Sequence, residues 1–114
     1  MIEEWCAVPG FEGSYEVSDQ GRVRSLPRLT QSNYKGAPYR KKVPGGLLKP
    51  QKHTGGYLHV GLSGKIYLVN WLVLEAFESL RPDGYVSCHN DGDKTNNRKS
   101  NLRWDTPKEN KETK

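Results

Sequence analysis

The sequence of 114 residues has only two cysteines, Cys6 and Cys88, and no hydrophobic run that approaches the length of a membrane span. Two isolated thiols are too few for a disulfide-stabilised fold, so we expect both to be reduced. A membrane-spanning helix needs about 20 consecutive apolar residues. The first residues carry neither the basic region nor the apolar segment of a secretory signal. We therefore expect a soluble, cytoplasmic protein with no membrane partner.

Apolar residues are scarce as well: they make up 33% of the chain, and the mean hydropathy is -0.86. A chain this short and polar has room for one small core, which excludes a large multidomain enzyme. Aromatic residues, at 10%, argue against a disordered chain. The composition predicts a small folded protein with a modest core.

Acidic residues are absent from Gln20 to Leu74, although this stretch holds ten basic residues. The first 19 residues carry five acids and no base, and residues 75–114 carry eight of each. A basic run of this kind is the electrostatic footprint of a polyanion-binding surface. Because the run is rich in glycine, proline and β-forming residues, it does not fit a membrane-binding helix. We expect double-stranded DNA as the partner; a solvated basic surface is the alternative.

Residues 5–25 are punctuated by Pro9-Gly10 and Gly21, a pattern that predicts short strands joined by tight turns. The two-residue period of a strand places the apolar side chains of this stretch on one face. Arg22 and Arg24 share the opposite face, where two adjacent guanidinium groups suit phosphates or guanine edges.

Residues 27–50 contain four of the seven prolines and no long apolar periodicity. We expect an extended basic segment that becomes ordered when it binds DNA. It adds Arg28, Arg40, Lys41 and Lys42 to the candidate DNA-binding residues. With the preceding strands it forms a predicted DNA-binding module over residues 1–50.

Residues 56–69 alternate in the manner of a β-hairpin around a turn at Ser63-Gly64-Lys65, which leaves His59 facing solvent. From Val69 to Leu80, apolar residues recur at helical spacing and predict an amphipathic helix. Asn70 is the expected N-cap of that helix. This helix is the strongest core element in the sequence.

The C-terminal third predicts a short strand ending at His89, a polar loop, a second strand at Leu102–Trp104 and the start of a helix. Thr106 and Glu109 have the spacing of a capping box, which puts Asn110 in the first helical turn. A unit of this size can bring a strand-end histidine and a first-turn side chain to opposite sides of one metal ion.

These residues resemble the HNH endonucleases with a ββα-metal finger, and specifically the small phage and intron-encoded homing-type group. The resemblance covers nearly the whole chain: Trp5 to Ser25 resembles the DNA-binding module, and the finger, about 85–114, matches through His89, Asn101 and Asn110. It implies an α+β fold with a short N-terminal β-ribbon module, then a β-hairpin plus helix, and a C-terminal finger. The nuclease domain would occupy residues 51–114.

The resemblance implies a metal-dependent endonuclease that hydrolyses DNA phosphodiester bonds and nicks as a monomer or weak dimer, without a small-molecule cofactor. His89 corresponds to the general base, a task that suits an imidazole because its ordinary pKa is about 6.5. Asn101 corresponds to the residue that holds the loop by hydrogen bonds to the backbone. Asn110 corresponds to the ligand of a divalent ion, with Mg²⁺ the first expectation. A phage or mobile-element origin and a bacterial cytoplasm follow from the same resemblance.

Two positions depart from the family pattern. Cys88 stands where a metal-binding Asp or Asn is frequent, and a soft thiolate is poorly matched to Mg²⁺, so Mn²⁺, Ni²⁺ or Zn²⁺ are alternatives. Asn70 stands where relatives usually carry a histidine, and we expect a structural effect only. The alternative function is a DNA-binding module with a catalytically degenerate finger. A structural zinc finger is less favoured because the finger lacks a second pair of ligands.

Overall fold

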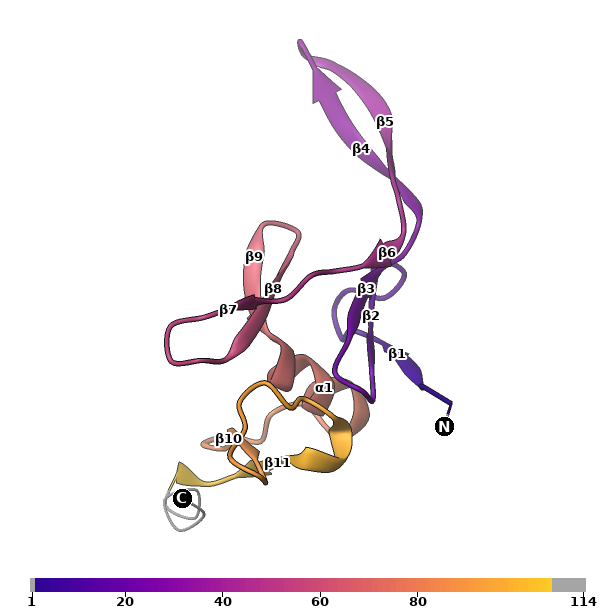
Figure 1. The fold of residues 1–114 in the computed structure, drawn as a ribbon. Helices are drawn as coiled ribbons and strands as arrows, with labels where there is room; N and C mark the ends of the chain where they lie inside the picture. The colour runs from indigo at the N-terminus through magenta and orange to yellow at the C-terminus, as the bar shows by residue number, and fades with distance from the viewer. Residues whose placement is uncertain (1, 108–114) are drawn as a thin grey trace.

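The computed structural model describes residues 2–107, and these residues are mostly β-strand with one α-helix and one short 3₁₀-helix (Figure 1). The elements in chain order are β1 (Trp5–Ala7), β2 (Tyr15–Ser18), β3 (Val23–Ser25), β4 (Arg28–Tyr34), β5 (Ala37–Val43), β6 (Gly46–Leu47), β7 (Gln51–Lys52), β8 (Leu58–Leu62), β9 (Lys65–Leu68), α1 (Val69–Phe77), β10 (Val86–His89), η1 (Lys99–Asn101) and β11 (Leu102–Asp105). No helix within residues 2–107 is long and apolar enough to cross a membrane.

The described strands form small antiparallel sheets with the orders β1-β2-β3-β6, β4-β5, β7-β8-β9 and β10-β11. In the N-terminal sheet, Val17 pairs with Val23 and Glu16 pairs with Arg24. Val17 and Val23 are both buried. The predicted ribbon, with one apolar face and one charged face, is therefore confirmed.

Helix α1 lies at the centre of the molecule and contacts strands of three sheets (Figure 1). Its buried face joins one apolar cluster with residues from the N-terminal sheet, from β8 and from β11. The members of the cluster are Val8, Tyr15, Val17, Val23, Val60, Leu62, Val69, Leu72, Val73, Leu74 and Leu102. The segments on both sides of the expected boundary after residue 50 thus share a core, and the division into two domains stays a prediction.

The hairpin and helix predictions are confirmed in position, but the Asn70 cap is wrong. Strand β9 runs directly into α1, so the N-cap position falls on Leu68, which makes no side-chain cap hydrogen bond. Asn70 lies inside the helix, is 2% exposed, and its amide donates a hydrogen bond to the Ser87 hydroxyl of β10. The helix ends at Phe77, so Leu80 lies beyond it and is exposed.

His59 is not the solvent-facing strand residue that the alternation predicts. Gln51 of β7 stands directly opposite His59, so their side chains share one face of the sheet. The His59 ring is half-buried and packs edge-on against His53 with 5.5 Å between ring centroids. Sequence alternation misses this contact because the two residues of β7 are too short a run to be recognised as a strand.

The expectation of an extended segment over residues 27–50 is also wrong. Strands β4 and β5 form a regular antiparallel hairpin that projects from the rest of the molecule (Figure 1). The two residues at its tip, Lys35 and Gly36, have φ values of 50° and 79°, which suit the tight turn whose twist matches paired strands. The prolines that suggested an irregular chain are compatible with the hairpin, since Pro27 and Pro44 flank it and Pro38 lies near its tip.

Candidate active site

His89 is the last residue of β10 and lies beside the loop that connects β10 to β11. Its Nε2 is 2.8 Å from the Oδ1 of Asn97 in that loop. With the amide oxygen as the acceptor, Nε2 of His89 is the donor of this hydrogen bond and Nδ1 is not part of it. The contact holds the half-buried imidazole in one orientation.

The turn between β2 and β3 packs against this loop. A Cβ atom on Gly21 would lie 2.7 Å from the backbone oxygen of Asn97, so only glycine allows the close approach. Gly21 also has φ +83°, a conformation that glycine adopts without strain. The backbone N–H of Lys99 donates to the oxygen of Asp19 at 2.8 Å. The N-terminal ribbon therefore holds the loop that orients His89.

Asn101, 9% exposed, closes the same loop through its side chain. Its Oδ1 accepts from the backbone N–H of Asp91 at 3.1 Å, and its Nδ2 donates to Asp91 Oδ1 and to the Asn96 backbone oxygen, each at 2.9 Å. These bonds tie the start of the loop to its end. The geometry is that of a residue that shapes the loop, which is the role that the family resemblance assigns to Asn101.

The carboxylate of Asp91 is hydrogen-bonded within the loop through both oxygens. It accepts hydrogen bonds from the Asn96 side chain, the Asp93 backbone and the Asn101 side chain, and together these lower its pKa to about 2. Asp93 in turn accepts from the backbone and hydroxyl of Thr95, which lowers the pKa of Asp93. Both carboxylates are ionised at neutral pH, and their hydrogen bonds stabilise the loop.

The Tyr57 ring lies beside the ring of His89. The two ring centroids are 6.0 Å apart. Lys94, from the loop, donates to the Gly55 backbone oxygen at 2.8 Å and places its ammonium group 4.8 Å from the Tyr57 ring centroid. The segment before β8 is thus fastened to the His89 loop by a cation–π contact and a hydrogen bond.

Cys88 lies on the other side of β10, because successive strand residues point to opposite faces. It is 3% exposed, and burial raises the pKa of its thiol. Arg103 stands directly opposite on β11, where it pairs with Asp105 at 2.9 Å. At neutral pH the Cys88 side chain is therefore a thiol packed into the protein, whereas a metal ligand must be a thiolate.

Residues 2–107 contain no cluster of three His, Cys, Asp or Glu side chains that could hold a metal ion. Asp91 and Asp93 are engaged by the loop, and Cys88 is buried. Asn110, the ligand that the resemblance assigns, lies outside the described residues, as does the Glu109 end of the capping box.

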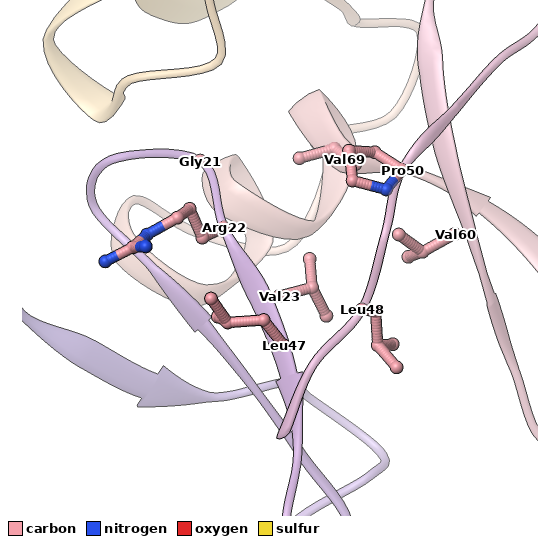
Figure 2. A pocket seen from close by; sticks show the side chains of 8 residues that line it. All are labelled: Gly21, Arg22, Val23, Leu47, Leu48, Pro50, Val60 and Val69. Carbon is pink, nitrogen blue, oxygen red and sulfur yellow. The ribbon is translucent and has the colours of Figure 1, made fainter.

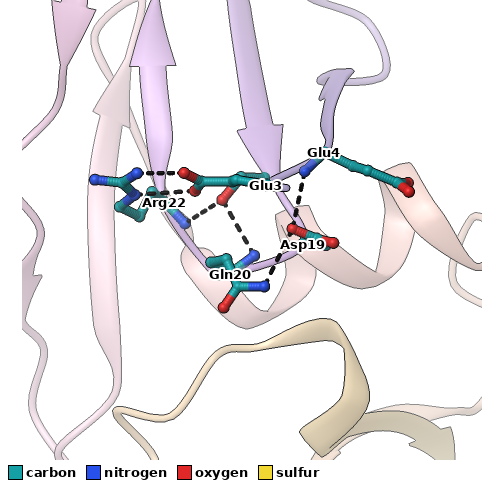
Figure 3. Close-up of polar contacts among 6 residues, drawn as sticks. Glu3, Glu4, Asp19, Gln20 and Arg22 are labelled. Carbon is teal, nitrogen blue, oxygen red and sulfur yellow. Dashed lines mark hydrogen bonds and ion pairs between the residues drawn. The ribbon is translucent and has the colours of Figure 1, made fainter. Parts of the chain in front are cut away.

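Three of the arginines expected to bind DNA are held by the protein itself. Arg22 pairs with Glu3, and this hydrogen bond lowers the pKa of Glu3 to about 2 (Figure 3). Arg24 pairs with Glu16 at 2.6 Å and stacks over the ring of Trp5. Glu3 and Glu16 therefore neutralise the two guanidinium groups that strand alternation places together.

Arg28 is anchored at the base of the projecting hairpin. Its Nη1 donates to the backbone oxygens of Ser14 and Leu26, at 3.0 and 2.9 Å, and to the Ser25 hydroxyl at 3.0 Å. Arg40, Lys41 and Lys42 lie further along β5, are exposed, and pair with no acid among the described residues. The structure therefore divides the six candidates between the body of the protein and the hairpin.

An apolar cavity of about 240 Å³ lies between β3, the segment after β6 and the start of α1 (Figure 2). It is lined by Gly21, Arg22, Val23, Leu47, Leu48, Pro50, Val60 and Val69. The one ionisable side chain in this lining is Arg22, which is bound to Glu3. The lining has no acid–base pair and includes no residue of the His89 loop.

Three residues near His89 carried no recognisable signal in the sequence: Asn97, Tyr57 and Arg103. Asn97 is one of several amides in a polar loop, and only its 4% exposure and its contact with His89 distinguish it. Tyr57 precedes a strand more than thirty residues before His89. Arg103 is marked only by its register opposite Cys88.

The chain matches two family models, the NUMOD4 motif over residues 3–63 and the HNH endonuclease model over residues 72–112. It is 36% identical over 113 residues to the DNA endonuclease I-HmuI of Bacillus phage SP01. A solved structure described as "DNA binding and cleavage by the HNH homing endonuclease I-HmuI" superposes with a TM-score of 0.73 at 37% identity.

Each of these two comparisons covers 96% of this chain and 56% of the relative, so the chain spans about half the length of the protein that it resembles. The NUMOD4 match crosses the expected boundary after residue 50. Taken together, the two models account for most of the sequence in the expected order. The chain therefore belongs to the HNH endonuclease family and carries an N-terminal NUMOD4 motif.

Proposed function

We propose that this chain is a DNA endonuclease in which His89 is the general base. The observation that carries the proposal is the 2.8 Å contact between His89 Nε2 and Asn97 Oδ1, which leaves Nδ1 free to accept a proton. A second support comes from the relative, which is named a DNA endonuclease. Its similarity to this chain extends over 113 residues, which include this site.

In this proposal, Nδ1 of His89 takes a proton from a water molecule. The oxygen of that water attacks the phosphorus atom of the scissile phosphodiester, and the bond from phosphorus to the 3′-oxygen breaks. The 3′-oxygen leaves with a proton from solvent, which gives a 3′-hydroxyl and a 5′-phosphate. Asn97 keeps the imidazole in the required tautomer, and Tyr57 restricts its movement.

HNH nucleases generally use a divalent metal ion, and the family resemblance gives Mg²⁺ as the first expectation, with Mn²⁺, Ni²⁺ or Zn²⁺ as alternatives. Such an ion supplies charge stabilisation at the phosphate. The described residues contain no cluster of three side chains that could hold such an ion. We further propose that Cys88 does not contact the ion, because its thiol is buried and protonated.

The chain has one finger and hence one site, so we propose that a monomer nicks one strand of double-stranded DNA. Strand β5 carries three exposed basic side chains that attract phosphates, those of Arg40, Lys41 and Lys42. We propose the cytoplasm of a bacterial host as the place of action, since the relative comes from a phage. A DNA-binding module with an inactive finger is the alternative, and the endonuclease name of the relative does not favour it.

The test is a nicking assay on supercoiled plasmid with Mg²⁺, Mn²⁺, Ni²⁺ or Zn²⁺ supplied in parallel. Wild-type protein should convert the plasmid to open circle, and His89→Ala should not, although both should shift the plasmid in a gel. Binding without cleavage by both proteins in every metal would reject the enzyme in favour of the binding module.

A further inference from the structure

The β4–β5 hairpin has the shape of an arm that fits a DNA groove. Each strand has seven residues, so the ribbon is about 20 Å long at the usual rise per residue. It projects from the body of the protein (Figure 1). A two-stranded ribbon of this kind fits the major groove of B-form DNA, which is about 12 Å wide.

The register of the hairpin separates its side chains into two different faces. Directly opposed residues share a face, and their neighbours along the strand lie on the other one. One face carries the opposed pairs Leu29 with Lys42, Gln31 with Arg40, and Asn33 with Pro38. The other face carries Thr30 opposite Lys41, and Tyr34 opposite Ala37. We call the first of these the amide face.

The chemistry of the amide face is that of base recognition. Arginine makes paired hydrogen bonds to guanine, and asparagine or glutamine makes them to adenine. Gln31 and Arg40 stand directly opposite each other, and Asn33 follows on the same face. All three are exposed. A phosphate-binding surface would need only charge, whereas this face combines amides with a guanidinium group.

The opposite face lacks this combination. Lys41 is its one basic side chain between the base of the hairpin and the tip, and the exposed tyrosines Tyr34 and Tyr39 lie close to the tip. Arg28 shares this face but is held at the base of the hairpin by Ser14, Ser25 and Leu26. Lys41 therefore offers charge without an adjacent amide.

We propose that the hairpin is a sequence-reading arm that enters the major groove with the amide face, Gln31, Asn33 and Arg40, toward the base edges. Lys41 then points away from the base pairs and contributes only electrostatic attraction. The inference rests on the proposed function in one respect, that the partner is double-stranded DNA. It goes further by assigning the specificity of binding to one face of one hairpin.

Arg40 and Lys41 offer a matched pair of variants, because they are adjacent on β5, both exposed, and on opposite faces. The full chain is used to select duplexes from a library with randomised base pairs, in buffer without divalent metal, and the bound DNA is sequenced. Binding is measured without cleavage, so the result does not depend on whether the chain nicks DNA.

Wild type should enrich a motif. Arg40→Ala should lose preference at one or two adjacent base pairs by about 10-fold, since each good paired contact discriminates by roughly this factor or more. Lys41→Ala should keep the motif, bind all sequences more weakly, and reduce the salt slope by about one ion. A wild type that enriches no motif, or an Arg40→Ala variant that enriches the wild-type motif, would overturn the proposal.

If the plasmid assay shows no nicking but this selection behaves as expected, the reading arm stands and the endonuclease proposal fails. If wild type nicks the plasmid but Arg40→Ala enriches an unchanged motif, the endonuclease proposal stands and the reading arm fails. Thermal unfolding of each variant is the control for an intact fold. Because the hairpin lies outside the apolar core, its variants should unfold as wild type does.

Discussion

His89 Nε2 and Asn97 Oδ1 lie 2.8 Å apart, and this contact holds the imidazole against the loop between β10 and β11. Asn97 is almost fully buried and its backbone rests on the Gly21 turn. The imidazole is consequently oriented by a segment of the NUMOD4 region as well as by its own loop.

Replacing Asn97 with aspartate should move the pH dependence of nicking. A carboxylate next to the imidazole favours its protonated form, so a higher pH is needed before the base is free to act. The acidic limb of the pH–rate profile should therefore shift to higher pH, while Asn97→Ala should lower the rate across the whole range. Profiles of Asn97→Asp and wild type that coincide would show that Asn97 does not act through His89.

Gly21→Ala should reduce both stability and nicking. The new Cβ meets the backbone of Asn97 at 2.7 Å, and the positive φ adds strain of about 1–2 kcal/mol. Gly10→Ala is the matched control, because Gly10 has φ +84° and nothing within 4 Å of an added Cβ. Urea unfolding should show destabilisation of both variants, with the larger effect in Gly21→Ala. Only Gly21→Ala should nick more slowly than wild type when both are folded; equal rates would contradict the coupling.

The His89 loop should lose its internal order in acid at an unusually low pH. The pKa of Asp91 is about 2 in the folded protein and about 3.9 in an unfolded chain, so its stabilising effect is complete above about pH 4 and disappears as the pH falls toward 2. The side-chain amide NMR signals of Asn101 should be constant from neutral pH to about pH 4 and move below it. Asp91→Asn should remove this transition, and a midpoint near pH 4 in wild type would contradict the assigned hydrogen bonds.

Cys88→Ala should leave the order of metal preference unchanged in the nicking assay. The thiol is 3% exposed and protonated, so its removal takes a packing contact and not a ligand. A modest loss of stability is expected from the smaller side chain. A shift of the preferred ion from Mn²⁺, Ni²⁺ or Zn²⁺ toward Mg²⁺ in Cys88→Ala would place the sulfur at the metal.

Regular alternation allowed much of the fold to be predicted from sequence. The ribbon around Val17 and Val23, the hairpin before α1, and the helix itself all have clear two-residue or helical periods. The β4–β5 hairpin was missed because prolines and polar residues hide its pattern, and its turn depends on the backbone conformation of Lys35-Gly36. Local signals identify elements but not the contacts between distant segments.

The candidate site was predictable only in part for the same reason. His89 and Asn101 stand out by their spacing and by the family resemblance. The pairing of Arg22 with Glu3, and the packing of Gly21 against Asn97, join residues far apart in sequence. Such contacts follow from the folded chain, in which the N-terminal turn lies against the C-terminal loop.

The most direct test of the account is the rate of plasmid nicking by wild type and His89→Ala under identical metal and salt conditions, with DNA binding measured in parallel. Loss of the general base should slow nicking by about 10²- to 10⁴-fold and leave binding unchanged. A His89→Ala protein that nicks at the wild-type rate would contradict the central claim.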